Sequence, residues 1–184
     1  MKRDIFVQCP GMGYKSLTMK KTLVVIFLFF STLSSSAQNY KLHSLFIFSF
    51  TRYVQWPDAY SDGDFEIAVL GDTPLIDELK AMAQSKKVGD RSIKVTKVGS
   101  VADLKKCHIL FVPAAKSGQI TDVLAKISSQ PVLVVTEENG MGAKGSIINF
   151  IMKDGKLAFE LNQAAVSKQN LKVSNELSRL AILI

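Results

Sequence analysis

The sequence has few residues of the kinds that build metal and redox sites, and it has no long hydrophobic run. Its two cysteines and two histidines form no cluster with the spacing of a zinc site. The apolar run Leu23–Phe30 is much shorter than the roughly 20 residues of a membrane-spanning helix. The motifs of P-loop proteins, serine hydrolases and zinc proteases are missing. We therefore expect no catalytic residues, no cofactor and no metal, and we do not expect an enzyme.

Positive charge is concentrated near the N-terminus. The whole chain carries a net charge of +7, but five of its basic residues and one acidic residue precede Gln38. From Gln38 onward the net charge is only +3, and like charges form no block. This balance gives no support to a nucleic-acid partner.

The segment that begins at Met19 has the layout of a secretory signal peptide. Two lysines precede the apolar run, and the small residues Ser35 and Ala37 suit cleavage after position 37. We therefore interpret residues 1–18 as a start-site extension outside the fold, 19–37 as a signal peptide, and 38–184 as one exported domain.

The hydrophobic pattern after residue 38 alternates between helices and strands. Apolar residues at spacings of three and four predict a helix over residues 40–54, which ends before Pro57. Strands are predicted at 65–70, 92–98, 108–113 and 131–135, with helical patterns at 73–84, 100–106 and 117–128. Alternating strands and helices predict a mainly parallel sheet with helices on both faces.

The C-terminal part follows a different pattern. Two alternating runs within residues 146–161 flank Asp154-Gly155, which is a strong hairpin signal. Ser174 is expected to cap a last helix that extends through Leu183. The predicted fold is thus a three-layer α/β sandwich with an antiparallel hairpin at one edge of its sheet.

The sequence "GMGAKG" matches a dinucleotide-binding fingerprint at Gly140, Gly142 and Gly145. That fingerprint requires a following helix, whereas the residues that follow read as a strand. We therefore interpret the segment as a glycine loop that leads into the hairpin. The neighbouring pair Glu137-Glu138 is expected to be solvated.

Three further features have two interpretations each. Trp56, the only tryptophan, is either a core residue that closes the base of the fold or an anchor for a partner. Asn162 is a candidate N-cap, and Glu160 shares its strand face, so the pair either grips a ligand or partner or is an outward polar face. Cys107 is either a buried thiol or one that senses oxidant or joins two chains.

Seven segments follow one another along the chain: FTRYVQWP, FEIAVLG, VGDRSIKV, CHILFVP, GSIINF, LAFELNQAAV and LKVSNELSRLA. In this order they resemble the YfiR-like family of exported bacterial proteins, and the resemblance covers nearly all of residues 40–183. The resemblance implies a compact α/β domain that forms homodimers in the periplasm. It also implies a regulator that represses a membrane-bound signalling protein, such as a diguanylate cyclase or a sensor kinase.

The resemblance also implies an apolar recognition patch for that membrane partner. The matching positions in this chain are Trp56, Pro57, Glu160, Asn162, Gln163 and Val166. Gln163 departs from the apolar residue usual in the family, which implies a more polar patch. Some relatives join the cysteine that matches Cys107 to a second cysteine; the expected mature chain lacks that second cysteine, which puts redox control through an internal bridge in doubt.

A different class of function is a small-ligand-binding protein. One lobe of a solute receptor has a similar α/β layout. This alternative predicts a deep apolar pocket with convergent polar groups near Gly140–Gly145.

Overall fold

The computed structural model describes residues 35–128 and 130–184. The chain divides into two units, residues 1–36 and Ala37–Ile184, and the second of them is compact. The predicted extension (1–18) and nearly all of the predicted signal peptide (19–37) lie outside the described residues, so both stay predictions. Among the described residues, no helix is long and apolar enough to cross a membrane.

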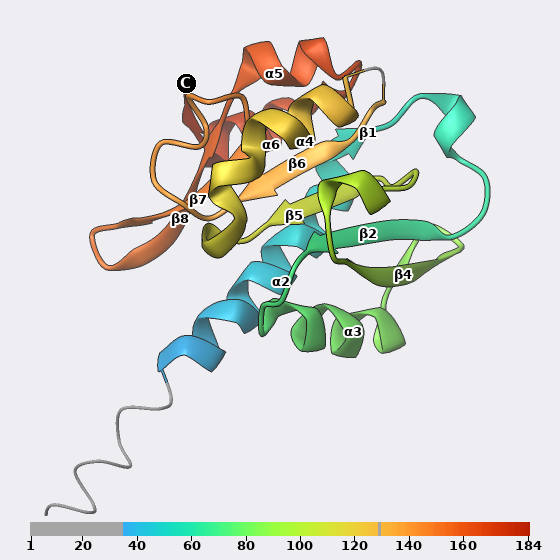
Figure 1. The fold of residues 1–184 in the computed structure, drawn as a ribbon, viewed down its shortest axis with the longest axis horizontal. Coiled ribbons are helices and arrows are strands. Elements are labelled where there is room, and N and C mark those ends of the chain that lie inside the picture. Colours follow the sequence, from blue (N-terminus) through green and yellow to red (C-terminus); the bar gives the residue numbers. More distant parts are fainter. Residues whose placement is uncertain (1–34, 129) are drawn as a thin grey trace, which may run out of the picture. The chain divides into compact units, whose positions relative to one another are not determined.

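The second unit is built on a curled, mostly parallel sheet of eight strands (Figure 1). Their spatial order is β10 (Ile182–Leu183), β8 (Lys156–Leu161), β7 (Ile148–Lys153), β6 (Leu133–Thr136), β5 (Ile109–Val112), β2 (Phe65–Leu70), β4 (Arg91–Val98) and β3 (Lys87–Val88). Only the β7–β8 and β3–β4 pairs of this sheet are antiparallel. The mixed α/β class and the mainly parallel sheet are confirmed, while the three-layer arrangement stays a prediction.

Hydrophobic side chains form two cores, because successive residues of a strand point to opposite faces of the sheet. In β6, Leu133 and Val135 belong to the larger core, and Val134 belongs to the smaller one. The larger core includes residues of α2 (Ser35–Tyr53), α3 (Leu75–Ser85), α5 (Gln163–Lys168) and α6 (Asn175–Leu180). The smaller core includes residues of α4 (Ile120–Lys126).

The hairpin prediction is confirmed, but its place at the sheet edge is wrong. Asp154 and Gly155 both have positive φ, at 51° and 72°, as a tight turn between antiparallel strands requires. However, β10 pairs in parallel with Glu160 and Leu161 at the end of β8, and it is the outermost strand there. The last helix therefore ends at Leu180 rather than Leu183, because Ile182 and Leu183 pair with β8 instead of continuing the helix.

The two predicted helices between β4 and β6 are shorter than expected. Only the 3₁₀ turn η2 (Val101–Asp103) forms within 100–106. The Ser100 hydroxyl bonds the Asp103 carboxylate at 2.7 Å instead of capping a backbone N–H. The helix predicted at 117–128 is divided into the 3₁₀ helix η3 (Ala114–Gln119) and α4.

Candidate partner-recognition site

Two segments of the predicted patch are joined through a small antiparallel sheet. The strand β1 (Val54–Gln55), at the end of α2, pairs with β9 (Lys172–Val173). The Ser174 N–H also donates to the Tyr53 carbonyl at 2.8 Å. The residues before Trp56 and those that follow α5 are therefore neighbours in space.

Trp56 is half-buried and held along one edge. Its indole N–H donates to the His108 carbonyl at 3.2 Å, and its ring meets the Phe65 ring edge-on at 5.1 Å and 87°. Part of the ring packs against the larger core, and the next residue, Pro57, is exposed. Trp56 thus combines a fixed core edge with accessible surface, which suits both interpretations of this residue.

Arg91 of β4 holds the loop that follows Trp56. Its Nε donates to the Gly63 carbonyl at 2.7 Å, and its Nη1 donates to the Tyr60 carbonyl at 3.0 Å. Its Nη2 reaches the carbonyls of Asp64 at 2.9 Å and Asp62 at 3.3 Å. One planar guanidinium thereby binds four carbonyls, which a lysine side chain cannot match.

His108 lies beneath the same loop as a buried, neutral ring. Its Nδ1 accepts the Glu66 N–H at 3.0 Å, so the ring proton is on Nε2, which donates to the Tyr60 carbonyl at 2.9 Å. The ring also stacks on Phe65, with the centroids 4.4 Å apart. Burial lowers the pKa of His108, and the positive charges of Arg91 and Lys106 lower it further.

Sequence reasoning missed Arg91 and His108 as parts of this site. In the sequence, Arg91 appears only within the segment VGDRSIKV and His108 only within CHILFVP. Cys107 and His108 directly precede β5, and their side chains lie on opposite faces of the sheet. Cys107 belongs to the smaller core, while His108 stacks on Phe65 of the larger core.

Asn162 binds the glycine loop of its own chain, and Glu160 binds Asn149 of β7 beside it. Asn162 caps α5, as predicted, because its Oδ1 accepts the Ala165 N–H at 2.9 Å. Its Nδ2 donates to the Gly142 carbonyl at 2.9 Å. The Glu160 Oε2 accepts from Asn149 Nδ2 at 2.9 Å. Asn162 therefore holds the loop in place, and any role of Glu160 and Asn162 toward a partner stays a prediction.

Buried hydroxyl and amide groups extend this contact beneath the loop. The Thr136 hydroxyl donates to the Asn149 Oδ1 at 2.7 Å, and it lies 2.9 Å from the Ser146 hydroxyl. All three side chains are buried. Since buried polar groups are costly unless paired, this arrangement fixes one conformation of the loop.

The two remaining patch residues differ in exposure. Gln163 opens α5 and is exposed, whereas Val166 is only 7% exposed and packs in the larger core. Gln163 can meet a partner directly. Val166 supports the segment from beneath.

The expectation that Glu137 is solvated is wrong. Its Oε1 accepts from the Ala114 N–H at 3.2 Å and from the Tyr40 hydroxyl at 3.4 Å, and its Oε2 lies 3.8 Å from His43 Nε2. Burial raises the pKa of the Glu137 carboxyl. Glu137 therefore links the end of β6 to α2 rather than facing water.

Cys107 is a free thiol with 2% of its surface exposed. Burial, followed by the negative charge of Glu66, raises its pKa to about 12. The buried-thiol interpretation therefore describes this residue, and a redox role stays a prediction. Within the described part of the chain, no three His, Cys, Asp or Glu side chains gather as a metal site would require.

Replacing Gly142 by alanine is expected to lower the free energy of unfolding by about 1 kcal/mol. A Cβ at this position would lie 2.8 Å from Glu160 Oε2 and would also overlap the Ile184 side chain. Moving Glu160 would deprive the buried Asn149 amide of its acceptor. Urea unfolding followed by circular dichroism measures the change.

Gly118→Ala is the matched control for this substitution. A Cβ at Gly118 would meet nothing within 4 Å, so alanine there is expected to leave stability unchanged or slightly raised. Equal effects of the two substitutions would show that the glycine loop tolerates a side chain at position 142.

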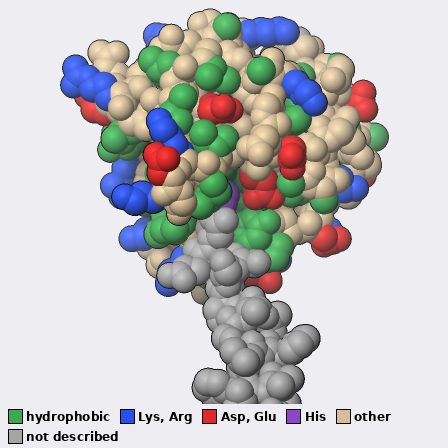
Figure 2. All heavy atoms as spheres, turned by 90° about the vertical axis from the view of Figure 1, so that its left-hand side faces the viewer, with side chains coloured by type: hydrophobic (Ala, Val, Ile, Leu, Met, Phe, Trp, Pro, Cys, Tyr) green, Lys and Arg blue, Asp and Glu red, His purple; other side chains and the backbone are tan. Residues whose placement is uncertain are grey.

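The surface carries hydrophobic side chains among charges of both signs. Figure 2 shows this mixture on one face of the molecule. Among the residues whose side chains the structure describes, the exposed large hydrophobic ones are Leu42, Leu45, Met152, Leu180, Leu183 and Ile184. A hollow of 260 Å³ lies beside the glycine loop, lined in part by Lys144, Gly145 and Asn162. This hollow lies where the small-ligand alternative placed its pocket.

The fold and the site define a small α/β domain that presents a half-buried tryptophan beside a tightly held loop. The chain belongs to the YfiR/HmsC-like family, whose pattern matches residues 40–182. The resemblance seen in the sequence is thus confirmed. Proteins of this family are periplasmic, and they are associated with the regulation of membrane signalling proteins in cyclic di-GMP signalling. A search of curated proteins gave no match.

Proposed function

We propose that this protein is an exported periplasmic regulatory binding protein that represses a membrane-bound signalling protein. The partner would be a diguanylate cyclase or a sensor kinase with a periplasmic sensor domain. Membership of the family supports this proposal. The protein acts through differential affinity. A regulator that binds the inactive state of its partner more tightly shifts the partner toward that state.

The observation that carries the proposal is the arrangement of Trp56. The indole is oriented by its bond to the His108 carbonyl, and the loop that follows is held by Arg91. An aromatic side chain fixed before binding loses little conformational entropy on association. Trp56, Pro57 and the exposed Gln163 are therefore proposed to contact the partner, while Glu160, Asn162 and Val166 hold the segments that surround it. We include a homodimer in this proposal.

The test is co-purification from membranes of cells that lack the native gene and express either the wild type or a variant. Wild type is expected to retain a membrane protein with a periplasmic sensor domain and to lower cellular cyclic di-GMP when that partner is a cyclase. Trp56→Ala is expected to weaken capture at least about tenfold, because buried aromatic anchors contribute about 2 kcal/mol or more to an interface.

Two further variants make the result specific. Gln163→Arg changes an exposed side chain of the patch and is also expected to reduce capture. Met152→Ala removes an exposed hydrophobic side chain from the hairpin and is expected to change nothing. Circular dichroism confirms that each variant is folded. Equal capture by all four proteins would remove Trp56 from the interface, and capture by none would contradict the proposed function.

A further inference from the structure

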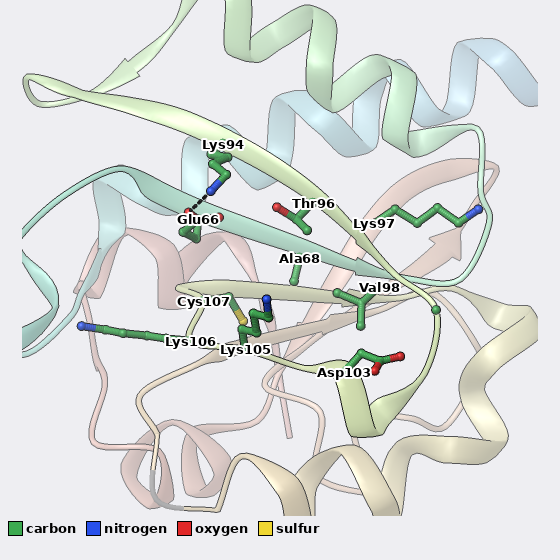
Figure 3. A pocket seen from close by; sticks show the side chains of 11 residues that line it. Glu66, Ala68, Lys94, Thr96, Lys97, Val98, Asp103, Lys105, Lys106 and Cys107 are labelled. Carbon is green, nitrogen blue, oxygen red and sulfur yellow. Dashed lines mark hydrogen bonds and ion pairs between the residues drawn. The ribbon is translucent and has the colours of Figure 1, made fainter.

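A cavity of 580 Å³ lies beside β2 and β4, on the face of the sheet opposite the Phe65 ring that contacts Trp56 (Figure 3). Glu66 and Ala68 of β2 face it, as do Lys94, Thr96 and Val98 of β4. These positions alternate along each strand, so their side chains share one face of the sheet. The segment that runs from Gly99 to Cys107 forms the opposite wall.

The floor of the cavity is apolar. Ala68, Val98 and Cys107 belong to the smaller core and reach the cavity from beneath. The sulfur of Cys107 is turned toward the cavity in Figure 3. Because burial raises the pKa of this thiol to about 12, it stays uncharged near neutral pH and continues the apolar floor.

The rim of the cavity is polar and carries an excess of positive charge. Four lysines line it, against the two carboxylates of Glu66 and Asp103. Glu66 is paired with Lys94 at 3.0 Å across the strands, and Asp103 is bound by Ser100 at 2.7 Å. Both carboxylates are therefore already engaged within the protein.

The four lysines differ in direction. Lys97 pairs with Asp72, and Lys106 donates to the Ala59 carbonyl at 3.2 Å. Figure 3 shows these two extending away from the cavity, whereas the Lys105 ammonium group is turned into it. Lys105 thus offers a positive charge directly above the apolar floor.

We propose that this cavity binds a small organic anion, whose apolar body lies on Ala68, Val98 and Cys107 and whose charged group meets Lys105. Sites for small molecules combine such apolar walls with a few polar groups, and cavities of this volume are typical of them. The Lys105 ammonium group, which is turned into the cavity, favours an anion over a cation of the same shape. This site goes beyond the proposed protein-binding function and does not depend on it.

The test uses three probes that share one apolar body: 2-naphthoate, 2-naphthalenemethanol and 2-naphthylmethylammonium. Isothermal titration of the wild type is expected to show tightest binding for the carboxylate. The neutral alcohol is expected to bind about threefold to fivefold more weakly, which is the range for a partly exposed charge contact. Acetate, which has the charged group alone, is expected to bind too weakly to measure.

Three variants assign the binding to this cavity. Lys105→Met keeps the alkyl stem and is expected to abolish the preference for the carboxylate. Thr96→Tyr fills the cavity with a residue that favours strands, and it is expected to abolish binding of all three probes. Lys156→Met removes an exposed lysine of the hairpin and is the control expected to leave every affinity unchanged.

A readout that does not rely on heat comes from the thiol on the cavity floor. In a chain that carries Cys9→Ser, Cys107 is the only thiol. A ligand that occupies the cavity is expected to slow the labelling of Cys107 by the factor 1 + [L]/Kd, or about tenfold at nine times Kd. The proposal is overturned by equal affinities for the three probes, by unchanged binding in Thr96→Tyr, or by unprotected Cys107 at saturating naphthoate.

Discussion

Replacing Arg91 by alanine is expected to lower the free energy of unfolding by about 2 kcal/mol. Hydrogen bonds to a charged group contribute about 1.5–3 kcal/mol each, but at a half-buried site water replaces part of what is lost. The guanidinium binds the carbonyls of Tyr60, Asp62, Gly63 and Asp64 at once. It also lies over the Phe65 ring, 5.5 Å from the centroid. Without it, the loop after Trp56 loses these four hydrogen bonds to β4.

Arg91→Lys separates the shape of the group from its charge. An ammonium group keeps the charge but cannot reach four carbonyls in one plane, so this variant is expected to lose most of the same stability. The exposed Arg179→Ala in α6 is the control, and its effect should stay within about 0.5 kcal/mol.

The measurement is urea unfolding followed by the fluorescence of Trp56, which is the only tryptophan and lies at the site. Hydrogen exchange of the amides from Tyr60 to Asp64 reports the local effect, and it is expected to accelerate in both Arg91 variants. Full stability in Arg91→Lys would mean that charge alone holds the loop. Unchanged exchange in Arg91→Ala would mean that the loop is held by other contacts.

The sequence allowed most of the sheet to be predicted because its strands have strong local signals. The apolar run at 65–70 matches β2, and Asp154-Gly155 forms the turn that its residue types favour. The edge strand β10 and the pair β1–β9 were missed, since strands of two residues have no periodicity. Their formation depends on backbone partners that are remote in the sequence.

The candidate site was predicted only in part for the same physical reason. Trp56 and Asn162 could be identified because a lone tryptophan and a helix cap are visible in the local sequence. The contribution of Arg91 depends on four carbonyls that approach it only in the folded chain, 27 to 31 residues away. The carbonyl group of a loop has no signature in the sequence, so the residue that binds it cannot be inferred from residue types.

His108 is expected to make the stability of the protein depend on pH in the mildly acidic range. The folded state holds the ring neutral for two reasons. Nδ1 accepts the Glu66 N–H, and the positive charge of Arg91 lies close to the ring, with its Nη2 2.9 Å from Nε2. A second ring proton would break the bond to Glu66 and add a positive charge beside Arg91 and Lys106. The Tyr60 and Phe65 rings, which pack against the imidazole, offer no negative charge to compensate.

The direction of the pH dependence follows from the lowered pKa of His108. The unfolded chain takes up a proton near its ordinary pKa of about 6.5, while the folded chain resists this until lower pH. The stabilisation is therefore complete above about pH 6.5 and is lost progressively as the pH falls toward the pKa of the folded state. Because the same ring supports Trp56, acidification should also increase the mobility of the recognition site.

His108→Asn isolates this contribution, because an asparagine oxygen can replace Nδ1 as the acceptor for the Glu66 N–H without titrating. Urea unfolding at several values between about pH 5 and pH 7.5 gives the stability of both proteins, and their difference at each pH cancels the other ionisable groups, including His43 and Glu137. The advantage of the wild type is expected to be largest near neutral pH and to shrink as the pH falls below about 6.5. If the difference in stability between wild type and variant stays constant across this range, His108 stabilises the loop by packing alone. If that difference grows on acidification, the folded state favours the imidazolium.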